Sequence, residues 1–367
     1  MTEERLSSLD VFRGITIAGM TLVNNPGSWD YVYPPLRHAE WHGWTPTDLV
    51  FPFFLFIVGV AISLSFSSKI EKGIEKPNLY FKIVKRSIIL FAIGILLALI
   101  FRFNFSTLRI PGVLQRIALC YLFSSLLFLN VRAKGRAVAT FLILASYWLM
   151  MKLIPVPGYG AGVMSFEGNL CGYIDTKLLA GHLYKAAFDP EGILSTLPAV
   201  STTLLGTLSG DWLRSSKTIM QKTGGIFIAG ILFTLSGLLL HPFFPINKQL
   251  WTSTYVLLTA GLALLLLGLC CLLIDLMRIK KWAAPFLVLG TNAIAVYVGS
   301  TLMVKLMALI KVSAGGKVLP LRAYIYAKLL APWAGAYIGS LIYPLLLILI
   351  WVGIMIPLYR KKIFIRI

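Results

Sequence analysis

The residues best suited to chemistry lie in the stretch 37–59, RHAEWHGWTPTDLVFPFFLFIVG, where two histidines stand just before a strongly apolar segment. Histidine has an unperturbed pKa of about 6.5, so it can take and return a proton near neutral pH. His38 is therefore a candidate general base, and a histidine without a function at a membrane boundary is the simpler alternative. His38 and His42 could share a metal, but the stretch has no HExxH pattern and Gly43 argues against a helix there, so we predict no metal site.

The element that must position these histidines is a helix that begins near Pro46. Thr45 is a favourable N-cap, Pro46 suits the first helical position, and Asp48 at the third position can accept a backbone N–H. The histidines then lie just outside the helix on the water side, together with Trp41 and Trp44, whose rings favour the membrane interface. Asp48 thus has a capping explanation as well as a catalytic one.

The composition indicates a polytopic membrane protein. Of 367 residues, 58% are hydrophobic and 13% are charged, and the mean hydropathy is +0.82, values that exclude an ordinary soluble domain. The net charge of +20 comes from basic residues that fall between apolar spans, so nucleic-acid binding is not predicted. The polar start MTEERLSSLD has no signal-peptide pattern, and we expect the first apolar segment to remain as an anchor. The four cysteines predict free thiols; Cys171 lies alone in a polar loop, and a nucleophilic role for it is the weaker interpretation.

Because about 20 apolar residues are needed to cross a bilayer, the apolar runs predict the topology. We predict one all-α domain, 1–367, with both termini cytoplasmic, since Lys and Arg are concentrated in the segments that would then lie inside. Residues 318–333 contain two prolines and two cations and are predicted as an interfacial or re-entrant helix. The spans, about ten in number, are predicted at residues 10–26, 48–67, 83–101, 112–130, 136–154, 193–213, 224–241, 251–275, 283–308 and 336–358.

Several polar residues fall inside these spans. An intramembrane cation costs about 3 kcal/mol, so Arg13 is a candidate for binding a phosphate or another anion, and an ion pair with Asp10 that fixes the helix end is the alternative. Gln115 and Arg116 open the fourth span and should face the interior of the bundle. Asn292 lies in the middle of the ninth span, where an Asn serves as often in helix contacts as in ligand binding.

The longest polar segment, 155–192, is predicted to be an external loop. Loops of this length in a compact protein are usually functional or disordered. Asp175, Asp189 and Glu191 suit hydrogen bonding to a hydroxylated ligand, and a solvated cap without a ligand is an equal alternative.

The chain resembles the heparan-α-glucosaminide N-acetyltransferase family over nearly its whole length. The lysosomal member of that family acetylates the terminal glucosamine of heparan sulfate with cytosolic acetyl-CoA. Each shared motif is modest alone, but the ordered set is specific. The motifs are LDVFRG, HAEW followed by TDLVFPFFLFIVG, RIPGVLQR, LIPVPGYG, GYID, DPEGILST, PINKQLW, NAIAVYVG and YRKKIF.

The resemblance implies a transmembrane acetyltransferase in which cytoplasmic acetyl-CoA donates an acetyl group to an amino sugar on the other side. It implies that His38 is the essential histidine, as general base or as acetyl carrier, with Asn24 and Asp48 beside it; for both of these, helix capping is the alternative. The further predicted site residues are Asp10, Arg13, Gln115, Arg116 and Asn292 for acetyl-CoA and Trp41, Asp189 and Glu191 for the sugar.

The chain also departs from the lysosomal enzyme. Position 42 is His here and Asn there, and the segment between Asn24 and His38 is longer here. The region before the first shared span is absent, which favours a homologue of the bacterial inner membrane with an acceptor other than heparan. The oligomeric state is left open, a homodimer being one option. A sugar or anion transporter is the alternative function, but the second half shows no repeat of the LDVFRG or RIPGVLQR pattern, which argues against it.

Overall fold

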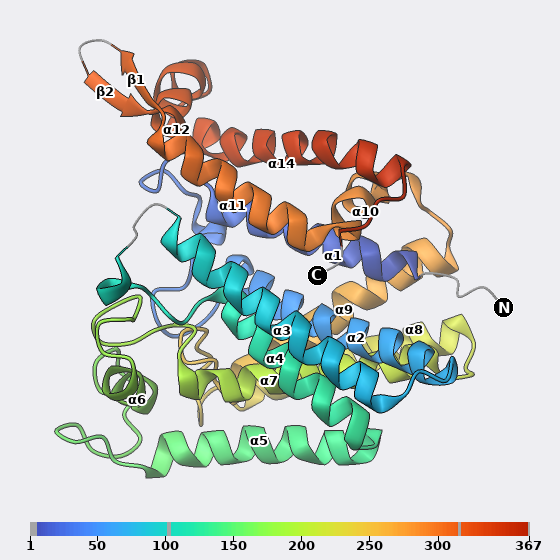
Figure 1. Cartoon of the computed structure of the whole chain (residues 1–367). Coiled ribbons are helices and arrows are strands. Elements are labelled where there is room, and N and C mark those ends of the chain that lie inside the picture. The colour runs from blue at the N-terminus through green and yellow to red at the C-terminus, as the bar shows by residue number, and fades with distance from the viewer. Residues whose placement is uncertain (1–5, 101–103, 315–316, 366–367) are drawn as a thin grey trace. The chain divides into compact units, whose positions relative to one another are not determined.

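The computed structural model describes residues 6–100, 104–314 and 317–365, and this part of the chain is mostly helical (Figure 1). Glu3 and Glu4 of the polar start, and residue 101 at the end of the third predicted span, lie outside the described residues. The α-helices are α1 (Ser7–Asn24), α2 (Val50–Glu71), α3 (Lys76–Leu99), α4 (Val113–Asn130), α5 (Ala133–Leu153), α6 (Leu170–Leu178), α7 (Ile193–Arg214), α8 (Ile219–Leu239), α9 (Ser253–Cys270), α10 (Ala284–Thr291), α11 (Ala293–Leu309), α12 (Leu321–Tyr324), α13 (Ala331–Ala334) and α14 (Ala336–Arg360).

Short elements join these helices. The 3-10 helices are η1 (Pro34–Leu36), η2 (Pro46–Leu49), η3 (Phe105–Thr107) and η5 (Lys281–Ala283), and the π-helical turns are η4 (Cys271–Leu276) and η6 (Ile325–Leu330). The strands are β1 (Lys311–Ala314) and β2 (Lys317–Pro320), which pair antiparallel. The described chain forms two compact units: unit 1 holds residues 6–39, 45–51, 269–314 and 317–365, and unit 2 holds 40–44, 52–100 and 104–268.

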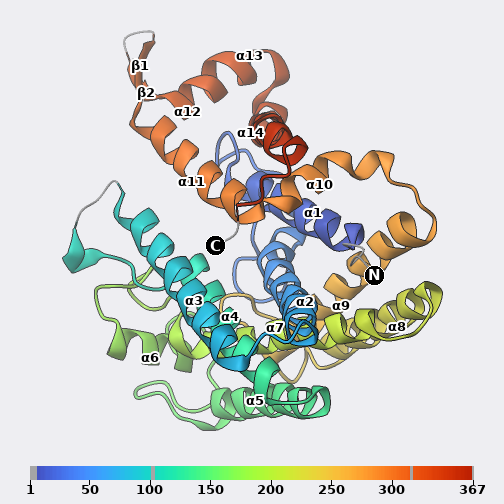
Figure 2. The same ribbon diagram turned by 45° about the vertical axis from the view of Figure 1, so that its right-hand side comes forward.

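In unit 1, α1 packs closely against α10 (Figure 2). Two glycines allow this approach: a Cβ at Gly14 would overlap the Phe286 carbonyl, and a Cβ at Gly290 would overlap the Asp10 carbonyl. α14 and α11 also contact α1. The small residues therefore bring the LDVFRG segment against the backbone of a helix near the other end of the chain.

In unit 2, α3 packs on α4, and α7 packs on both α4 and α5. Gly59 of α2 and Gly206 of α7 face each other's backbones, since a Cβ at Gly59 would overlap the Thr203 carbonyl and one at Gly206 would overlap the Phe56 carbonyl. Inside a bilayer the lipid tails are as apolar as the helices, so no hydrophobic driving force brings helices together. Close approach through small residues is therefore the usual way in which helices pack there.

The structure supports a multi-pass membrane protein. Among the described residues, seven helical segments are long and apolar enough to cross a membrane, and a bent pair of helices raises the number to eight. The predicted count of ten is not confirmed, because α1 and α3 form helices at the first and third predicted spans but are not among these segments. The seven are residues 46–71, 113–130, 133–153, 193–214, 219–239, 253–276 and 336–360.

The ninth predicted span is not one straight helix. It breaks at Asn292, and its two parts, Lys281–Thr291 and Ala293–Leu309, are bent by 76°. The Asn292 amide explains the break, since its Nδ2 donates to the Ile363 carbonyl at 3.2 Å and its Oδ1 accepts the Ile365 N–H at 2.7 Å. The side chain thus binds the main chain of the C-terminal segment.

The segment predicted as a helix over 318–333 is corrected at its start. Residues 318–320 belong to β2, where Val318 pairs with Ser313 of β1, and the helical part runs from Leu321 to Ala334. Pro320 accounts for the boundary, since it lacks an N–H and is tolerated at the end of an edge strand. The all-α prediction therefore missed one small hairpin.

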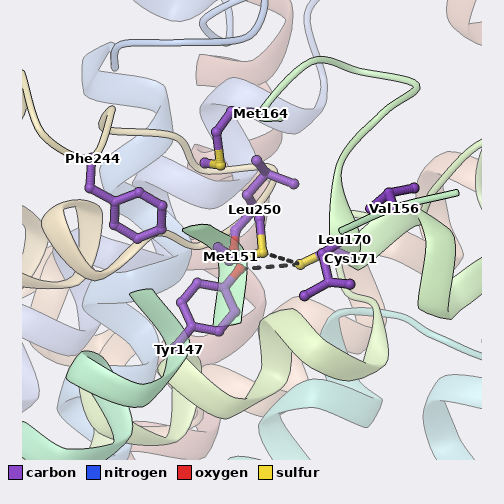
Figure 3. Packing of buried hydrophobic residues seen from close by; sticks show 8 residues of the cluster. All are labelled: Tyr147, Met151, Val156, Met164, Leu170, Cys171, Phe244 and Leu250. Carbon is purple, nitrogen blue, oxygen red and sulfur yellow. Dashed lines mark hydrogen bonds between the residues drawn. The ribbon is translucent and has the colours of Figure 1, made fainter. Parts of the chain in front are cut away.

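A buried cluster joins α5, α6 and the segment that leads into α9 (Figure 3). Tyr147 donates its hydroxyl to the Leu250 carbonyl at 2.5 Å and lies 3.2 Å from the Cys171 sulfur. Burial raises the pKa of the Cys171 thiol to about 12. Cys171 is therefore a packing residue, and the four cysteines are free thiols as predicted.

Candidate active site

The centre of the candidate site is a histidine–carboxylate pair in unit 1. His38 Nδ1 lies 2.6 Å from Asp48 Oδ1. The Asp48 side chain is 1% exposed, whereas that of His38 is 41% exposed. A buried acid thus holds a ring that remains open to solvent.

The local sequence builds this pair through the start of a helix. Asp48 Oδ2 accepts the backbone N–H groups of Ala39 and Thr45, each at 3.0 Å, and forms a capping box with Thr45. Pro46 occupies the first position of η2, which leads directly into α2, so the predicted helix start is confirmed. The cap and the histidine use different oxygens of one carboxylate, and both roles weighed for Asp48 are therefore compatible.

This geometry decides the chemistry of the ring. A carboxylate at Nδ1 favours the tautomer with a proton on Nδ1, which puts the lone pair of the neutral ring on Nε2. The same carboxylate stabilises the imidazolium that forms when Nε2 takes a proton. His38 can therefore act as a base or as a nucleophile through Nε2.

The third residue predicted for this site, Asn24, is placed differently. It is the last residue of α1 and is exposed. Among the described residues its side chain makes no hydrogen bond to His38 or Asp48. A role for Asn24 stays a prediction.

Arg13 and Asp10 form the predicted ion pair. Arg13 Nη1 donates to Asp10 Oδ1 at 2.9 Å and lies 3.3 Å from the Gly290 carbonyl. The pair joins α1 to α10 within unit 1. The structural alternative for Arg13 is thus present, and binding of acetyl-CoA by these two residues or by Asn292 stays a prediction.

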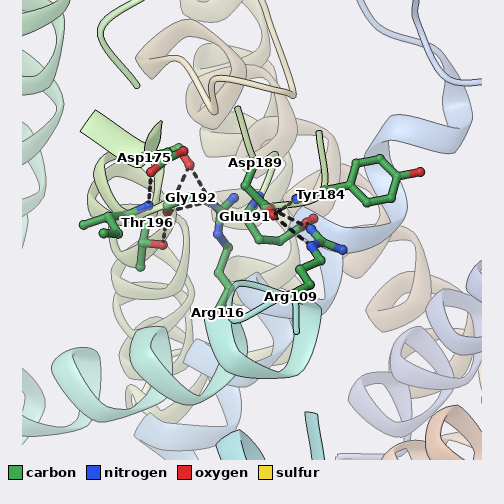
Figure 4. A network of polar contacts seen from close by, with 10 residues as sticks. Arg109, Arg116, Asp175, Tyr184, Asp189, Glu191, Gly192 and Thr196 are labelled. Carbon is green, nitrogen blue, oxygen red and sulfur yellow. Dashed lines mark hydrogen bonds and ion pairs between the residues drawn. The ribbon is translucent and has the colours of Figure 1, made fainter. Parts of the chain in front are cut away.

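Arg116 and Gln115 lie inside unit 2, as expected for polar residues in a bundle. Arg116 is 1% exposed; its Nη2 bonds to Ser195 Oγ and to the Gly192 carbonyl (Figure 4), and its guanidinium lies over the Trp251 ring at 5.0 Å. The Nε and Nη1 atoms have no hydrogen-bond partner within the described part of the chain. Arg116 therefore keeps donors that a ligand or a water could use.

Asp189 and Glu191 share a single cation, Arg109 (Figure 4). Arg109 donates from Nε and Nη2 to the two oxygens of Asp189, at 2.8 and 2.6 Å, and from Nη2 to Glu191. Asp189 is buried and also accepts the N–H groups of Tyr184 and Glu191. Burial alone would lower the pKa of Arg109, but these bonds raise it overall.

Asp175 is the most unusual acid of the loop 155–192, which was predicted to be external. It is fully buried; Oδ1 accepts the Ile193 N–H at the start of α7, and Oδ2 has no partner among the described residues. Burial raises its pKa to about 6 against the opposing bond to Ile193. Gly192 makes room for this carboxylate, since a Cβ there would overlap Asp175 Oδ2.

Trp41 and His42 are anchored within unit 2. Trp41 Nε1 donates to the Met164 carbonyl at 2.7 Å, and its ring packs edge-on against two phenylalanines. His42 Nδ1 lies 3.3 Å from Asn247 Nδ2. Burial lowers the pKa of His42, and His241 lowers it further, so His42 is neutral near pH 7 and can accept this bond.

Sequence reasoning missed Arg109 and Asn247 as partners of the predicted residues. Their partners lie 80 and 205 positions away, and no local pattern links them. Only the position of Arg109 as the first residue of RIPGVLQR could have drawn attention to it.

The fold and this pair define a polytopic helical membrane protein with a carboxylate-oriented histidine just before a span. The chain belongs to the family described as heparan-α-glucosaminide N-acetyltransferase, catalytic, whose model matches residues 5–234. It is 32% identical to the human heparan-α-glucosaminide N-acetyltransferase over 352 residues, which cover 80% of this chain and 52% of the human protein. It is 31% identical to the mouse protein over 352 residues, 80% of this chain and 53% of that protein. The chain thus spans about half the length of these curated relatives.

Proposed function

We propose that this protein is a transmembrane acetyltransferase that moves an acetyl group from cytoplasmic acetyl-CoA to the amine of a glucosamine-type sugar on the external side. The observation that carries the proposal is the bond between His38 Nδ1 and the buried Asp48. Family membership supports the acetyl transfer, because the two relatives are named as N-acetyltransferases of an α-glucosaminide.

In the direct route, the sugar amine attacks the thioester carbonyl carbon. The C–N bond forms, the C–S bond breaks, and the amine proton passes to His38 Nε2. Asp48 stabilises the resulting imidazolium, which returns its proton to the departing thiolate. The exposure of the His38 ring supports access by an external acceptor.

In the covalent route, His38 Nε2 attacks the thioester and the CoA thiolate leaves, which gives an acetylimidazole. The sugar amine then attacks the acetyl carbonyl carbon, the new C–N bond forms as the bond from that carbon to Nε2 breaks, and the freed Nε2 takes the amine proton. Asp48 serves both routes, because each places positive charge on the ring. The routes differ in whether acetyl-enzyme accumulates without a sugar.

The test uses purified protein with acetyl-labelled CoA and glucosamine. We expect transfer by the wild type and a loss of about 10²-fold or more in His38→Ala, the usual contribution of a general base. Glu40→Gln is the matched control, because Glu40 is an exposed residue of the same loop. Transfer by His38→Ala at the wild-type rate, or no transfer to any amino sugar by the wild type, would overturn the proposal.

A labelling experiment without acceptor separates the two routes. Label that stays on the wild-type protein, is absent from His38→Ala and leaves when glucosamine is added identifies the covalent route. Transfer in the full assay without any labelled protein identifies the direct route.

A further inference from the structure

At one end of unit 2, α2 and α4 end and α3 and α5 begin (Figure 1). A cavity of about 580 Å³ is lined by residues of these helix ends. Its volume is within the range of small-molecule sites. The predicted topology places this end of the bundle on the cytoplasmic side. None of the residues predicted for the site from the sequence lines it.

Two helices present their N-termini to this cavity. Lys76 and Ala133, the first residues of α3 and α5, line it. Neither N-cap, Glu75 or Arg132, makes a side-chain capping bond. The first N–H groups of each helix and a dipole of about half a positive charge therefore favour an anion here.

Arg136 supplies a second, independent indication of an anion. It lines the cavity from the first turns of α5 and is 4% exposed. Its Nη1 bonds to Thr207 at 2.8 Å and its Nη2 to Asp211, but its buried Nε has no hydrogen-bond partner among the described residues. A buried guanidinium N–H without an acceptor is costly, so a ligand oxygen there would be stabilised.

The acids that line the cavity are already paired. Asp211 accepts from Arg136 and from Ser63 at 2.7 Å, and Glu71 accepts from Arg214 at 2.5 Å. The exposed Lys76 and Arg132 form no ion pair with the described residues. The cavity therefore presents uncompensated positive charge.

We propose that this cavity binds a phosphate-bearing anion. Guanidinium groups and helix N-termini share phosphate as a preferred ligand. Two sources carry that chemistry: the nucleotide end of the acyl-CoA donor, which rests on the proposed function, and the headgroup of an anionic phospholipid in the surrounding membrane.

The test compares two double variants that remove the same charge. Lys76→Gln with Arg132→Gln removes the two exposed cations of the cavity, and Lys82→Gln with Lys134→Gln removes exposed cations outside it. All four residues are exposed, so both proteins should fold, and equal melting temperatures verify this. Arg136 is left intact because its ion pair joins α5 to α7.

In nanodiscs of phosphatidylcholine, CoA is titrated and its Kd is measured. In nanodiscs that also contain phosphatidylglycerol, native mass spectrometry measures the bound anionic lipid. We expect the cavity variant to raise the Kd of CoA about tenfold, near the effect of one lost ion contact, with the control within about twofold. Loss of bound phosphatidylglycerol with unchanged CoA affinity also supports the phosphate site and assigns it to lipid.

If neither CoA affinity nor lipid occupancy differs between the two double variants, the proposal is wrong. A wild-type protein that binds CoA through this cavity but transfers no acetyl group would overturn the proposed function alone. The two proposals therefore fail separately.

Discussion

Two buried aspartates in segments predicted to be external show how the partner of a carboxylate decides what it can do. Asp48 in unit 1 bonds a half-exposed imidazole, whereas Asp189 in unit 2 bonds the guanidinium of Arg109. Both acids also accept two backbone N–H groups, so both are structural. Only the imidazole can gain and lose a proton near neutral pH.

The Arg109 cluster, which consists of Arg109, Asp189 and Glu191, is therefore suited to stabilise the fold and not to transfer a proton. Asp189 and Glu191 converge on one permanently charged group, and the guanidinium also lies over the Tyr184 ring at 4.7 Å. His38, in contrast, is bound through Nδ1 to Asp48, and its ring is partly exposed. We therefore expect substitutions at the first pair to change the rate and substitutions at the second cluster to change stability.

The largest expected effect is on the rate of Asp48→Asn. Asn can still accept a backbone N–H, but it lacks the charge that fixes the Nδ1–H tautomer of His38 and stabilises its protonated form. We expect kcat for acetyl transfer to fall about 10²–10⁴-fold, with the exposed carboxylate variant Glu40→Gln as control. A kcat within about threefold of wild type would show that Asp48 only caps α2.

The next largest effect is on the stability of Arg109→Met. Removing the cation leaves two carboxylates with no opposite charge. Breaking a buried pair typically costs about 3–5 kcal/mol, and because Arg109 is partly exposed we expect the lower end, about 3 kcal/mol. We expect a lower melting temperature in detergent and nearly unchanged kcat/KM per folded molecule. Lys311→Met, at an exposed position, is the control.

Glu191→Gln tests whether Glu191 serves acceptor binding or the stability of the Arg109 cluster. If it raises KM for the sugar about tenfold without changing the melting temperature, Glu191 contacts the acceptor as the sequence suggested. A shift in melting temperature with constant KM assigns it to the Arg109 cluster instead.

The sequence predicted best what depends on neighbouring residues. Thr45, Pro46 and Asp48 start a helix because their capping bonds close within four residues, and Asp10 with Arg13 pairs across one helical turn. The Asp48–His38 bond spans ten residues and was expected only through the family resemblance. Local chemistry and a shared motif therefore located the centre of the site.

Contacts between distant segments were not predictable from the sequence. The apolar run across Asn292 gave no sign of a bend. The hydrogen-bond partners of the Asn292 amide are main-chain groups of residues 363–365, which are distant in the sequence. The loop 155–192 was predicted to offer acids to a ligand, yet it contains α6 and buries Asp175 and Asp189. Which acids face inward depends on Arg109, Gly192 and the start of α7, and these positions are fixed only by the tertiary fold.

Asp175 provides the smallest effect, a dependence of stability on pH. Its folded pKa is raised from 3.8 to about 6, because burial outweighs the hydrogen bonds from the backbone of Ile193 and Asp189; the charge of Asp189 raises the pKa and that of Arg116 lowers it. The folded state therefore holds a proton that the unfolded state releases between about pH 4 and 6. Asp175 contributes most stability below pH 4, and that contribution is lost as pH rises through about 6, by about 1–3 kcal/mol.

Asp175→Asn isolates this effect, because Asn resembles the protonated acid and can still accept the Ile193 N–H. The melting temperature of the wild type, relative to that of the variant, should fall from pH 4 to 6 and stay constant from pH 6 to 8. Other carboxylates titrate in both proteins and cancel in the difference. A constant difference from pH 4 to 8 would mean that Asp175 is ionised throughout, and its carboxylate would then be held as firmly by Ile193 and Arg116 as Asp189 is held by Arg109.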